Sequence, residues 1–382
     1  MTDSQKYFLE LVKAGLWEKD VELQKYGTTD FDEIMRLAEE QSVVGLVTAG
    51  LEHVTDVKVP QEVLLQLIGS TLQIEQQNKE MNLFVARLIE KLRKEDVYAL
   101  LVKGQGIAQC YEKPLWRASG DIDLFLSDTN YEKAKKILAP SASTVEEEYV
   151  REKHLGMTID NWVVEQHGRL YCGLSRRIER ELDDVLYDTF YGGAVRSWDN
   201  NGVQVFLLKA ENDAFYVFTH ILQHFYKEGV GLRQICDWCR LLYTYREKLD
   251  LRLLESRIKR AGLMTEWRAF GALAVDYLGM PKEAMPFLDV RSLKEDGRCV
   301  IDMRLRRKAE RIKDFILMSG NFGHNRDMSY YSKYPFLLRK FCSMWMRVKD
   351  LYHHARIFPQ DSLQFSFHIL VNGFKSAMRG EG

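Results

Sequence analysis

The sequence predicts an α+β protein in which a block of short strands and helices is flanked on both sides by helices. Three observations support this class. Residues 96–206 contain short continuous or alternating apolar runs, which are typical of strands. The segments before and after this block carry apolar residues at helical intervals. Only seven prolines occur, and none lies before Pro60 or between Ser141 and Met280.

The first of three expected parts, residues 1–95, is a helical N-terminal segment. Phe31–Glu40 is predicted as a short amphipathic helix. A longer helix is expected over Val63–Lys94, because its apolar residues follow helical spacing, and it ends in a charged cluster at residues 93–96.

The second part, residues 96–206, is the expected α/β core. Val97–Val102 (VYALLV) is a continuous apolar run and predicts a buried strand, and Asp121–Leu126 (DIDLFL) predicts a second strand. The other predicted elements of this part are a helical turn over Ile107–Tyr111, a helix over Tyr131–Leu138, and strands over Glu148–Met157 and Asn161–Leu170.

The third part, residues 207–382, is an expected helical C-terminal region. The predicted helices are Ala210–Tyr226, Leu232–Lys248, Leu251–Arg260 and Leu293–Met318. A turn rich in Gly and Asn is expected over residues 319–325, and the last sixty residues are expected to be helical with interleaved aromatic residues.

Length and composition exclude several classes of protein. The 382 residues are 46% hydrophobic and 29% charged, which excludes a disordered or collagen-like chain. The net charge of −1 gives no support to a dedicated nucleic-acid binder, although nucleic acid stays a possible partner. No stretch approaches the ~18 apolar residues of a membrane span. With no signal-peptide pattern and only six cysteines, we expect a cytoplasmic protein with reduced thiols and no membrane partner.

The Asp-Ile-Asp pattern of the second strand is the most informative chemical feature. Side chains alternate along a strand, so Asp121 and Asp123 point to the same face. Two adjacent carboxylates repel each other, and either a cation between them or solvent exposure at a strand end relieves the repulsion. An oxygen-only pair suits Mg²⁺ or Mn²⁺. The pattern alone leaves both interpretations open.

The residues before this pair have features of a phosphate-binding site. The first strand ends in Lys103-Gly104-Gln105-Gly106, where glycines let backbone N–H groups approach a phosphate. Lys103 and Arg117 add positive charge for phosphate oxygens. The simpler interpretation is an ordinary strand-to-helix turn for the glycines and surface ion pairs for the two cations.

These residues follow one another in a characteristic order. A Lys-Gly at a strand end precedes a Tyr, a Pro, an Arg and then Asp-Ile-Asp-Leu, and the residues are Lys103, Gly104, Tyr111, Pro114, Arg117, Asp121, Asp123 and Leu124. Further motifs are Val164-Glu165-Gln166-His167, a helical pair with His220 and His224, and Leu232-Arg233 with Asp237. Over roughly Phe84–Tyr245 the chain therefore resembles the uncharacterised nucleotidyltransferase family of the DNA polymerase β-type superfamily. A weaker similarity to the family extends to the turn over Gly320–Gly323.

The resemblance implies a mixed sheet with flanking helices and a carboxylate triad that is catalytic and binds Mg²⁺ or Mn²⁺. Asp121 and Asp123 would be its first two members, and Glu165 on a later strand the third; the alternative for Glu165 is an exposed strand carboxylate. The implied substrate-binding residues are Lys103, Gly104, Arg117 and Ser119. The implied reaction moves a nucleoside monophosphate from a nucleoside triphosphate to an unknown acceptor hydroxyl.

One departure from the superfamily signature raises an alternative. The signature opens the helix after the first strand with Gly-Ser, whereas here Gly104 is followed by Gln105 and the spacing to Asp121 is longer. Ser119-Gly120 directly precedes the aspartates instead. A catalytically inactive nucleotide-binding or scaffold protein that keeps the fold is the alternative function. A third hypothesis is a helical interaction protein whose aspartates face water.

Two pairs of side chains in the C-terminal region have metal-ligand spacing. His220 and His224 share a face of a predicted helix, a spacing that can hold zinc, but no HExxH motif is present. A structural role, or a place facing the active cleft, is the simpler interpretation. Cys236 and Cys239 form a lone Cys-x-x-Cys inside a predicted helix, and we expect two core thiols.

Two further histidines, His154 and His167, lie on the two strands near Glu165. One of them could accept a proton, because the pKa of an imidazole lies near neutrality. The simpler interpretation is a pair of structural histidines that support the neighbouring carboxylates.

Overall fold

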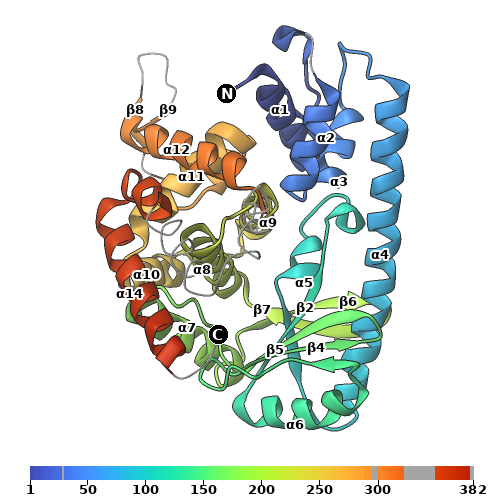
Figure 1. Ribbon diagram of the computed structural model, residues 1–382, viewed down its shortest axis with the longest axis vertical. Coiled ribbons are helices and arrows are strands. Elements are labelled where there is room, and N and C mark those ends of the chain that lie inside the picture. Colours follow the sequence, from blue (N-terminus) through green and yellow to red (C-terminus); the bar gives the residue numbers. More distant parts are fainter. Residues whose placement is uncertain (28–29, 289, 294–298, 322–348, 379–382) are drawn as a thin grey trace, which may run out of the picture.

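The computed structural model describes residues 1–27, 30–288, 290–293, 299–321 and 349–378. A seven-stranded mixed sheet is combined with helices before, around and after it, which confirms the predicted α+β class. In Figure 1 the N-terminal helices lie above the sheet, and the C-terminal helices line the opposite side of the molecule.

Capping residues stabilise the starts of two N-terminal helices. Thr2 and Gln5 form a capping box at the first helix, and the Asp30 side chain accepts two backbone N–H groups at the next α-helix. The elements of this part are α1 (Asp3–Trp17), η1 (Gln24–Tyr26), α2 (Phe31–Glu40), α3 (Val44–Leu51) and α4 (Gln61–Arg93). Helix α4 has 33 residues and runs down one side of the molecule to the sheet (Figure 1).

The sheet has the strand order β3-β4-β5-β2-β1-β7-β6. Its strands are β1 (Ala99–Val102), β2 (Asp121–Leu126), β3 (Thr144–Val145), β4 (His154–Ile159), β5 (Trp162–His167), β6 (Val195–Asn200) and β7 (Val203–Leu208). The central strand β2 is antiparallel to β1 and parallel to β5. The tight turn between β4 and β5 uses Asp160 and Asn161, both at positive φ, as a two-residue hairpin turn requires.

The two faces of the sheet have different partners. Ile122, Leu124 and Leu126 point to an apolar core that α4 and α6 complete. Asp121, Asp123 and Phe125 point to the other face, because side chains alternate along β2. The helices within this part are α5 (Gly104–Ala108), η2 (Pro114–Trp116), α6 (Asp128–Leu138), η3 (Ala139–Ser141) and α7 (Arg176–Phe190).

The C-terminal helices surround a large aromatic core. Phe218, Trp238 and Trp267 are fully buried and contact one another, with ring centroids 4.7–5.1 Å apart. The elements of this part are α8 (Ala210–Lys227), α9 (Leu232–Tyr245), α10 (Leu251–Ala261), α11 (Met264–Leu278), η4 (Lys282–Ala284), β8 (Val290–Leu293), β9 (Cys299–Ile301), α12 (Met303–Ser319) and α14 (Pro359–Met378). Within the described residues, no helix combines the length and apolarity that a membrane crossing needs.

Some predicted boundaries differ from the structure. The helix expected over residues 293–318 is wrong in its first part: β9 pairs with β8, and α12 begins only at Met303, where the Asp302 side chain caps it. The strand expected over residues 148–157 is β4, which begins six residues later at His154. Most of the turn expected over residues 319–325, and much of the helical segment expected near the C-terminus, lie outside the described residues.

Candidate active site

Lys103 occupies the turn between β1 and α5. Its neighbour Val102 pairs with Asp123 across the β1–β2 ladder, so Lys103 lies level with the aspartates. Its φ is 56°, a left-handed conformation that costs a residue with a side chain about 1–3 kcal/mol. The side chain ends 2.8 Å from Asp123 (Nζ–Oδ1). The strained turn therefore places a cation directly on one of the three predicted metal ligands.

The Gly104-Gln105 turn presents no side chain to the aspartates. Gly104 has a φ of 39°, and a Cβ added to it would lie 3.6 Å from the Asp121 carbonyl oxygen. Gln105 is 2% exposed and turns toward α4, where its Nε2 donates to Asn78 Oδ1 at 2.8 Å. Gln105, which stands where the superfamily signature has a serine, is thus a buried amide that holds α5 against α4. Helix α5 has five residues.

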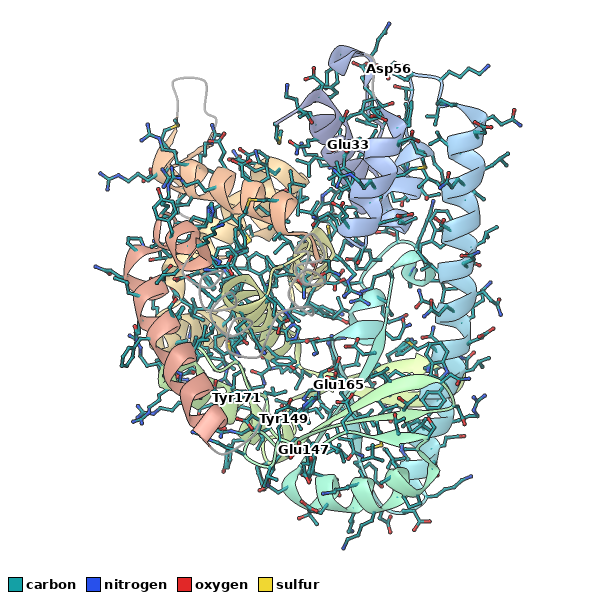
Figure 2. The ribbon with its side chains drawn as sticks, in the orientation of Figure 1. Glu33, Asp56, Glu147, Tyr149, Glu165 and Tyr171 are labelled. Carbon is teal, nitrogen blue, oxygen red and sulfur yellow. The ribbon has the colours of Figure 1, made fainter. Side chains whose placement is uncertain are left out.

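Three carboxylates come together on the sheet face opposite α4. Asp121 and Asp123 lie on β2, and the parallel pairing of β2 with β5 places Asp123 directly opposite Glu165. One ligand oxygen of each residue lies within 4.8 Å of the other two. Figure 2 shows Glu165 on the side of the sheet that faces the C-terminal helices. The group that the resemblance implied is therefore assembled by strand register.

The charges of this group are set by its neighbours. Repulsion from Asp123, together with burial, raises the pKa of Asp121. Burial alone would raise the pKa of Asp123 as well, but Lys103 and His167 outweigh it and lower that pKa. Hydrogen bonds from His154 and then His167 lower the pKa of Glu165. Asp123 and Glu165 are therefore ionised at neutral pH. The repulsion among the three adjacent carboxylates acts mainly on Asp121, whose pKa it raises.

Arg117 lies in a buried network. Its guanidinium forms two hydrogen bonds to Asp237 on α9, Nε–Oδ1 at 2.9 Å and Nη2–Oδ2 at 2.7 Å. Tyr111 donates to the same carboxylate at 2.7 Å (Oη–Oδ1), and Arg117 Nη1 donates to Ser119 Oγ at 2.7 Å. Arg117 and Ser119 are therefore bound to each other and to α9, and they fix the segment that leads into Asp121.

A pocket opens between the aspartates and helices α8 and α9. Residues that line it include Asp121, Asp123, His220, Ile221, Arg233 and Gln234. Arg233 donates to the Ala118 carbonyl at 2.8 Å (Nη1–O), while its buried Nε has no hydrogen-bond partner among the described residues. Burial, and then repulsion from Arg117, lower the pKa of Arg233. In the sequence Arg233 and Asp237 stand out only as parts of a motif, and no local pattern indicates a role for either of them.

The whole of this site lies within a match to a known family. Over residues 27–279, about two thirds of its length, the chain matches the family model described as uncharacterised nucleotidyltransferase. The chain belongs to this family. The match is longer than the predicted range of Phe84–Tyr245, and it does not include residues 320–323, of which 322 and 323 lie outside the described residues. Searches of curated proteins and of solved structures gave no significant match.

The donor set of this family member fits a divalent cation. Asp121, Asp123 and Glu165 supply only carboxylate oxygens, the ligands that Mg²⁺ and Mn²⁺ prefer. Asp123 Oδ1 already accepts from Lys103 and His167, so its Oδ2 is the oxygen left for a cation. Asp121 has no such donor in the described part of the chain, and repulsion from Asp123 outweighs the attraction of Lys103 and Arg233. A cation at this group would relieve the repulsion that raises its pKa.

The histidine pair and the cysteine pair predicted from the sequence lie in different parts of the structure. His220 lines the pocket, with its Nε2 3.3 Å from Lys103 Nζ and 3.2 Å from His224 Nε2. Burial and the Lys103 ammonium lower the pKa of His220 well below its usual range, so this imidazole is neutral. Cys236 and Cys239 are fully buried free thiols in the aromatic core, as predicted.

Proposed function

We propose that this family member is a metal-dependent nucleotidyltransferase that moves a nucleoside monophosphate from a nucleoside triphosphate to an acceptor hydroxyl. The grouping of Asp121, Asp123 and Glu165 within 4.8 Å is the observation that carries the proposal. Family membership supports a nucleotide substrate and an enzymatic role. We also propose a cytoplasmic location, where nucleoside triphosphates are abundant.

The three carboxylates would hold Mg²⁺ or Mn²⁺. When bound, the cation would orient the triphosphate and neutralise the charge that develops on it. Lys103 and His167 keep Asp123 ionised, and His154 with His167 keep Glu165 ionised. These neighbours therefore prepare two of the ligands before any cation arrives.

Phosphate binding is assigned to the cations around the pocket. Arg233 lines the pocket, and its Nε has no hydrogen-bond partner among the described residues, which suits this arginine to a phosphate oxygen. Arg117 is already paired with Asp237, so its role is to position the segment with Ser119 that precedes Asp121. Lys103 and Gly104 form the turn beside the aspartates, where the lysine braces Asp123.

The acceptor would enter from the side of α8 and α9, whose residues line the pocket opposite the aspartates. Its hydroxyl oxygen forms a bond to the α-phosphorus while the bond to pyrophosphate breaks. A carboxylate oxygen of the group would accept the proton that this hydroxyl loses. The helical C-terminal region thus shapes the acceptor site.

Incubation with each labelled ribonucleoside triphosphate and Mg²⁺ or Mn²⁺ tests the proposal. We expect pyrophosphate release or self-modification with the wild type, together with a rise in melting temperature, because a ligand that binds only the folded state stabilises it. Asp121→Asn should abolish both signals. Asp160→Asn, a change of the same chemistry at the exposed β4–β5 turn, should leave them intact. If no triphosphate shifts the melting temperature at millimolar concentration, the proposal fails.

An inactive nucleotide-binding protein is the second candidate, and the position of Gln105 favours it. The signature serine is replaced by an amide that bonds to Asn78 and does not face the pocket. This alternative expects a cation-dependent thermal shift with a triphosphate but no pyrophosphate and no labelled product with any acceptor. The same incubation therefore separates the two functions.

A further inference from the structure

Beside the carboxylate group, two histidines converge on one oxygen of Glu165. Strands β4 and β5 are antiparallel, and His154 is the register partner of His167. Glu165 lies two residues before His167 and therefore points to the same face. His154 Nε2 and His167 Nε2 lie 3.3 Å and 3.4 Å from Glu165 Oε2. The three ligand atoms lie within 4.8 Å of one another.

These separations match the edges of a tetrahedral metal site. Zinc binds histidine nitrogen and carboxylate oxygen at about 2.0–2.2 Å, so two ligands of a tetrahedral ion lie about 3.3–3.5 Å apart. The two distances to Glu165 Oε2 fall in this range. An ion could therefore bind Glu165 Oε2 together with either histidine nitrogen, and the two nitrogens lie within 4.8 Å of each other.

The two imidazoles lie against each other on neighbouring strands. Their ring centroids are 4.8 Å apart and their planes are inclined by 26°, so the rings are stacked. Tyr149 continues the stack on the outer side of His154, at 5.9 Å and 28°. The side chains of His154 and Glu165 are 24% and 29% exposed. An ion from solvent can reach the group, and water or a ligand can occupy a remaining coordination position.

A glycine opposite Glu165 makes room for another carboxylate. Gly156 is the register partner of Glu165, and a Cβ added there would collide with the carboxylate of Glu146. Because residues 154 and 156 share a face, this carboxylate lies over the same face as the histidines. It adds negative charge beside the group and would strengthen the attraction of a cation.

We propose that His154, Glu165 and His167 form a second metal site, which binds a zinc-like divalent transition-metal ion. Two imidazole nitrogens with one carboxylate suit zinc and its neighbours, whereas Mg²⁺ prefers oxygen ligands alone. This site differs from the Asp121/Asp123 pair in its preferred ion and shares Glu165 with it. The proposal does not depend on the transfer reaction, because it concerns the binding of the ion itself.

Occupation of the site would change the aspartate group. His167 Nε2 lies 2.8 Å from Asp123 Oδ1 in a hydrogen bond that requires a proton between them. As the nitrogen–metal bond forms, this proton is lost to solvent and the hydrogen bond to Asp123 breaks. Asp123 then keeps Lys103 as its partner. We therefore expect an ion at the histidine site to change the affinity of the aspartates for Mn²⁺, and the reverse by the same factor.

The test is a titration of the metal-stripped full chain with Co²⁺, followed by visible absorption and then by displacement with Zn²⁺. We expect one equivalent with the strong bands of a four-coordinate site, and loss of these bands when Zn²⁺ displaces Co²⁺. His154→Gln should weaken Co²⁺ binding at least tenfold, because it removes one of three protein ligands. Asp121→Asn should keep the bands, since Asp121 is not part of this site.

A matched control uses another histidine that lies between carboxylates. His53 Nε2 is 2.8 Å from Glu18 Oε2, and its Nδ1 is 3.4 Å from Asp20 Oδ1, far from the sheet in sequence. His53→Gln should leave the Co²⁺ bands unchanged. If His154→Gln binds Co²⁺ as tightly as the wild type, or if only Asp121→Asn loses the bands, the histidine site is wrong.

A second measurement needs no variant. Diethyl pyrocarbonate modifies accessible imidazoles, and peptide mass spectrometry reports each histidine separately. We expect Zn²⁺ to reduce modification of His154 at least fivefold and to leave that of His53 unchanged. Equal modification of His154 with and without Zn²⁺ would overturn the proposal even if His154→Gln does not fold.

Discussion

Arg117 and Asp237 form a buried bidentate ion pair that joins the segment before β2 to helix α9. Both side chains are only 6% exposed, and Tyr111 donates to the same carboxylate. The pair lies between the aspartate strand and the helix that carries Arg233. This ion pair therefore fixes the two sides of the pocket, β2 and α9, relative to each other.

The first prediction concerns the stability of this pair. Asp237→Asn should lower the free energy of unfolding by about 3–5 kcal/mol, because it leaves Arg117 buried without a counter-charge. Arg117→Met combined with Asp237→Leu should cost less than Asp237→Asn alone, since no unpaired charge remains. Urea unfolding followed by circular dichroism measures both.

The control for this prediction is an exposed pair. Glu255 and Lys259 on α10 lie 2.8 Å apart, with side chains 40% and 61% exposed. Glu255→Gln should change the free energy of unfolding by less than about 1 kcal/mol. A loss for Asp237→Asn no larger than this would contradict the assigned role of the buried pair.

Local patterns and long-range contacts differ in how well the sequence predicts them. Strand β2 lies at the predicted residues Asp121–Leu126, because alternation of side chains is a local signal. The approach of Glu165 to Asp123 depends on strand pairing, which only the resemblance to the family implied. The Arg117–Asp237 pair joins residues 120 positions apart, and no local pattern predicts such a contact. The division of the chain after residues 95 and 206 stays a prediction.

The second prediction concerns pH and a carboxyl group away from the site. Glu266 on α11 is fully buried, and burial, followed by repulsion from Asp361, raises its pKa well above the usual range. The folded state therefore binds this proton more tightly than the unfolded state. Stability falls as the pH rises above the ordinary value of a glutamate and continues to fall until the raised pKa is passed.

Glu266→Gln should remove this pH dependence. We expect the variant to melt at a higher temperature than the wild type at pH 8, and the difference to vanish as the pH falls toward 4. Thermal melts across this range measure it, with Glu255→Gln as a control for the same chemical change on a surface. A variant that is less stable than the wild type by an equal amount at every pH would show that the contribution of this side chain does not depend on its ionisation, and would contradict the raised pKa.

The third prediction concerns the Cys-x-x-Cys of α9. Cys236→Ser and Cys239→Ser should each lower the free energy of unfolding by about 1–3 kcal/mol, because a hydroxyl replaces a thiol in an apolar core. Neither should change the zinc content of the purified protein, which elemental analysis measures. Cys236→Ala separates the cost of the hydroxyl from the loss of the sulfur atom. Loss of one equivalent of zinc in either serine variant would mean that these thiols bind metal.

The last prediction assigns triphosphate binding to Arg233. Its buried Nε has no hydrogen-bond partner among the described residues, and burial together with Arg117 lowers its pKa. Arg233→Met removes a poorly compensated charge and one bond to the Ala118 carbonyl, so the metal-free protein should stay within about 1 kcal/mol of the wild type. The affinity for a nucleoside triphosphate should fall about 10- to 100-fold, the effect of a lost charged hydrogen bond.

Calorimetric titration with a triphosphate and with the corresponding nucleoside separates a phosphate contact from a change in pocket shape. A phosphate contact predicts a large loss for the triphosphate and none for the nucleoside. Arg87→Met, at an exposed position of α4 outside the pocket lining, should leave both affinities unchanged. Equal losses for both ligands in Arg233→Met would mean that this arginine maintains the pocket wall and does not bind phosphate.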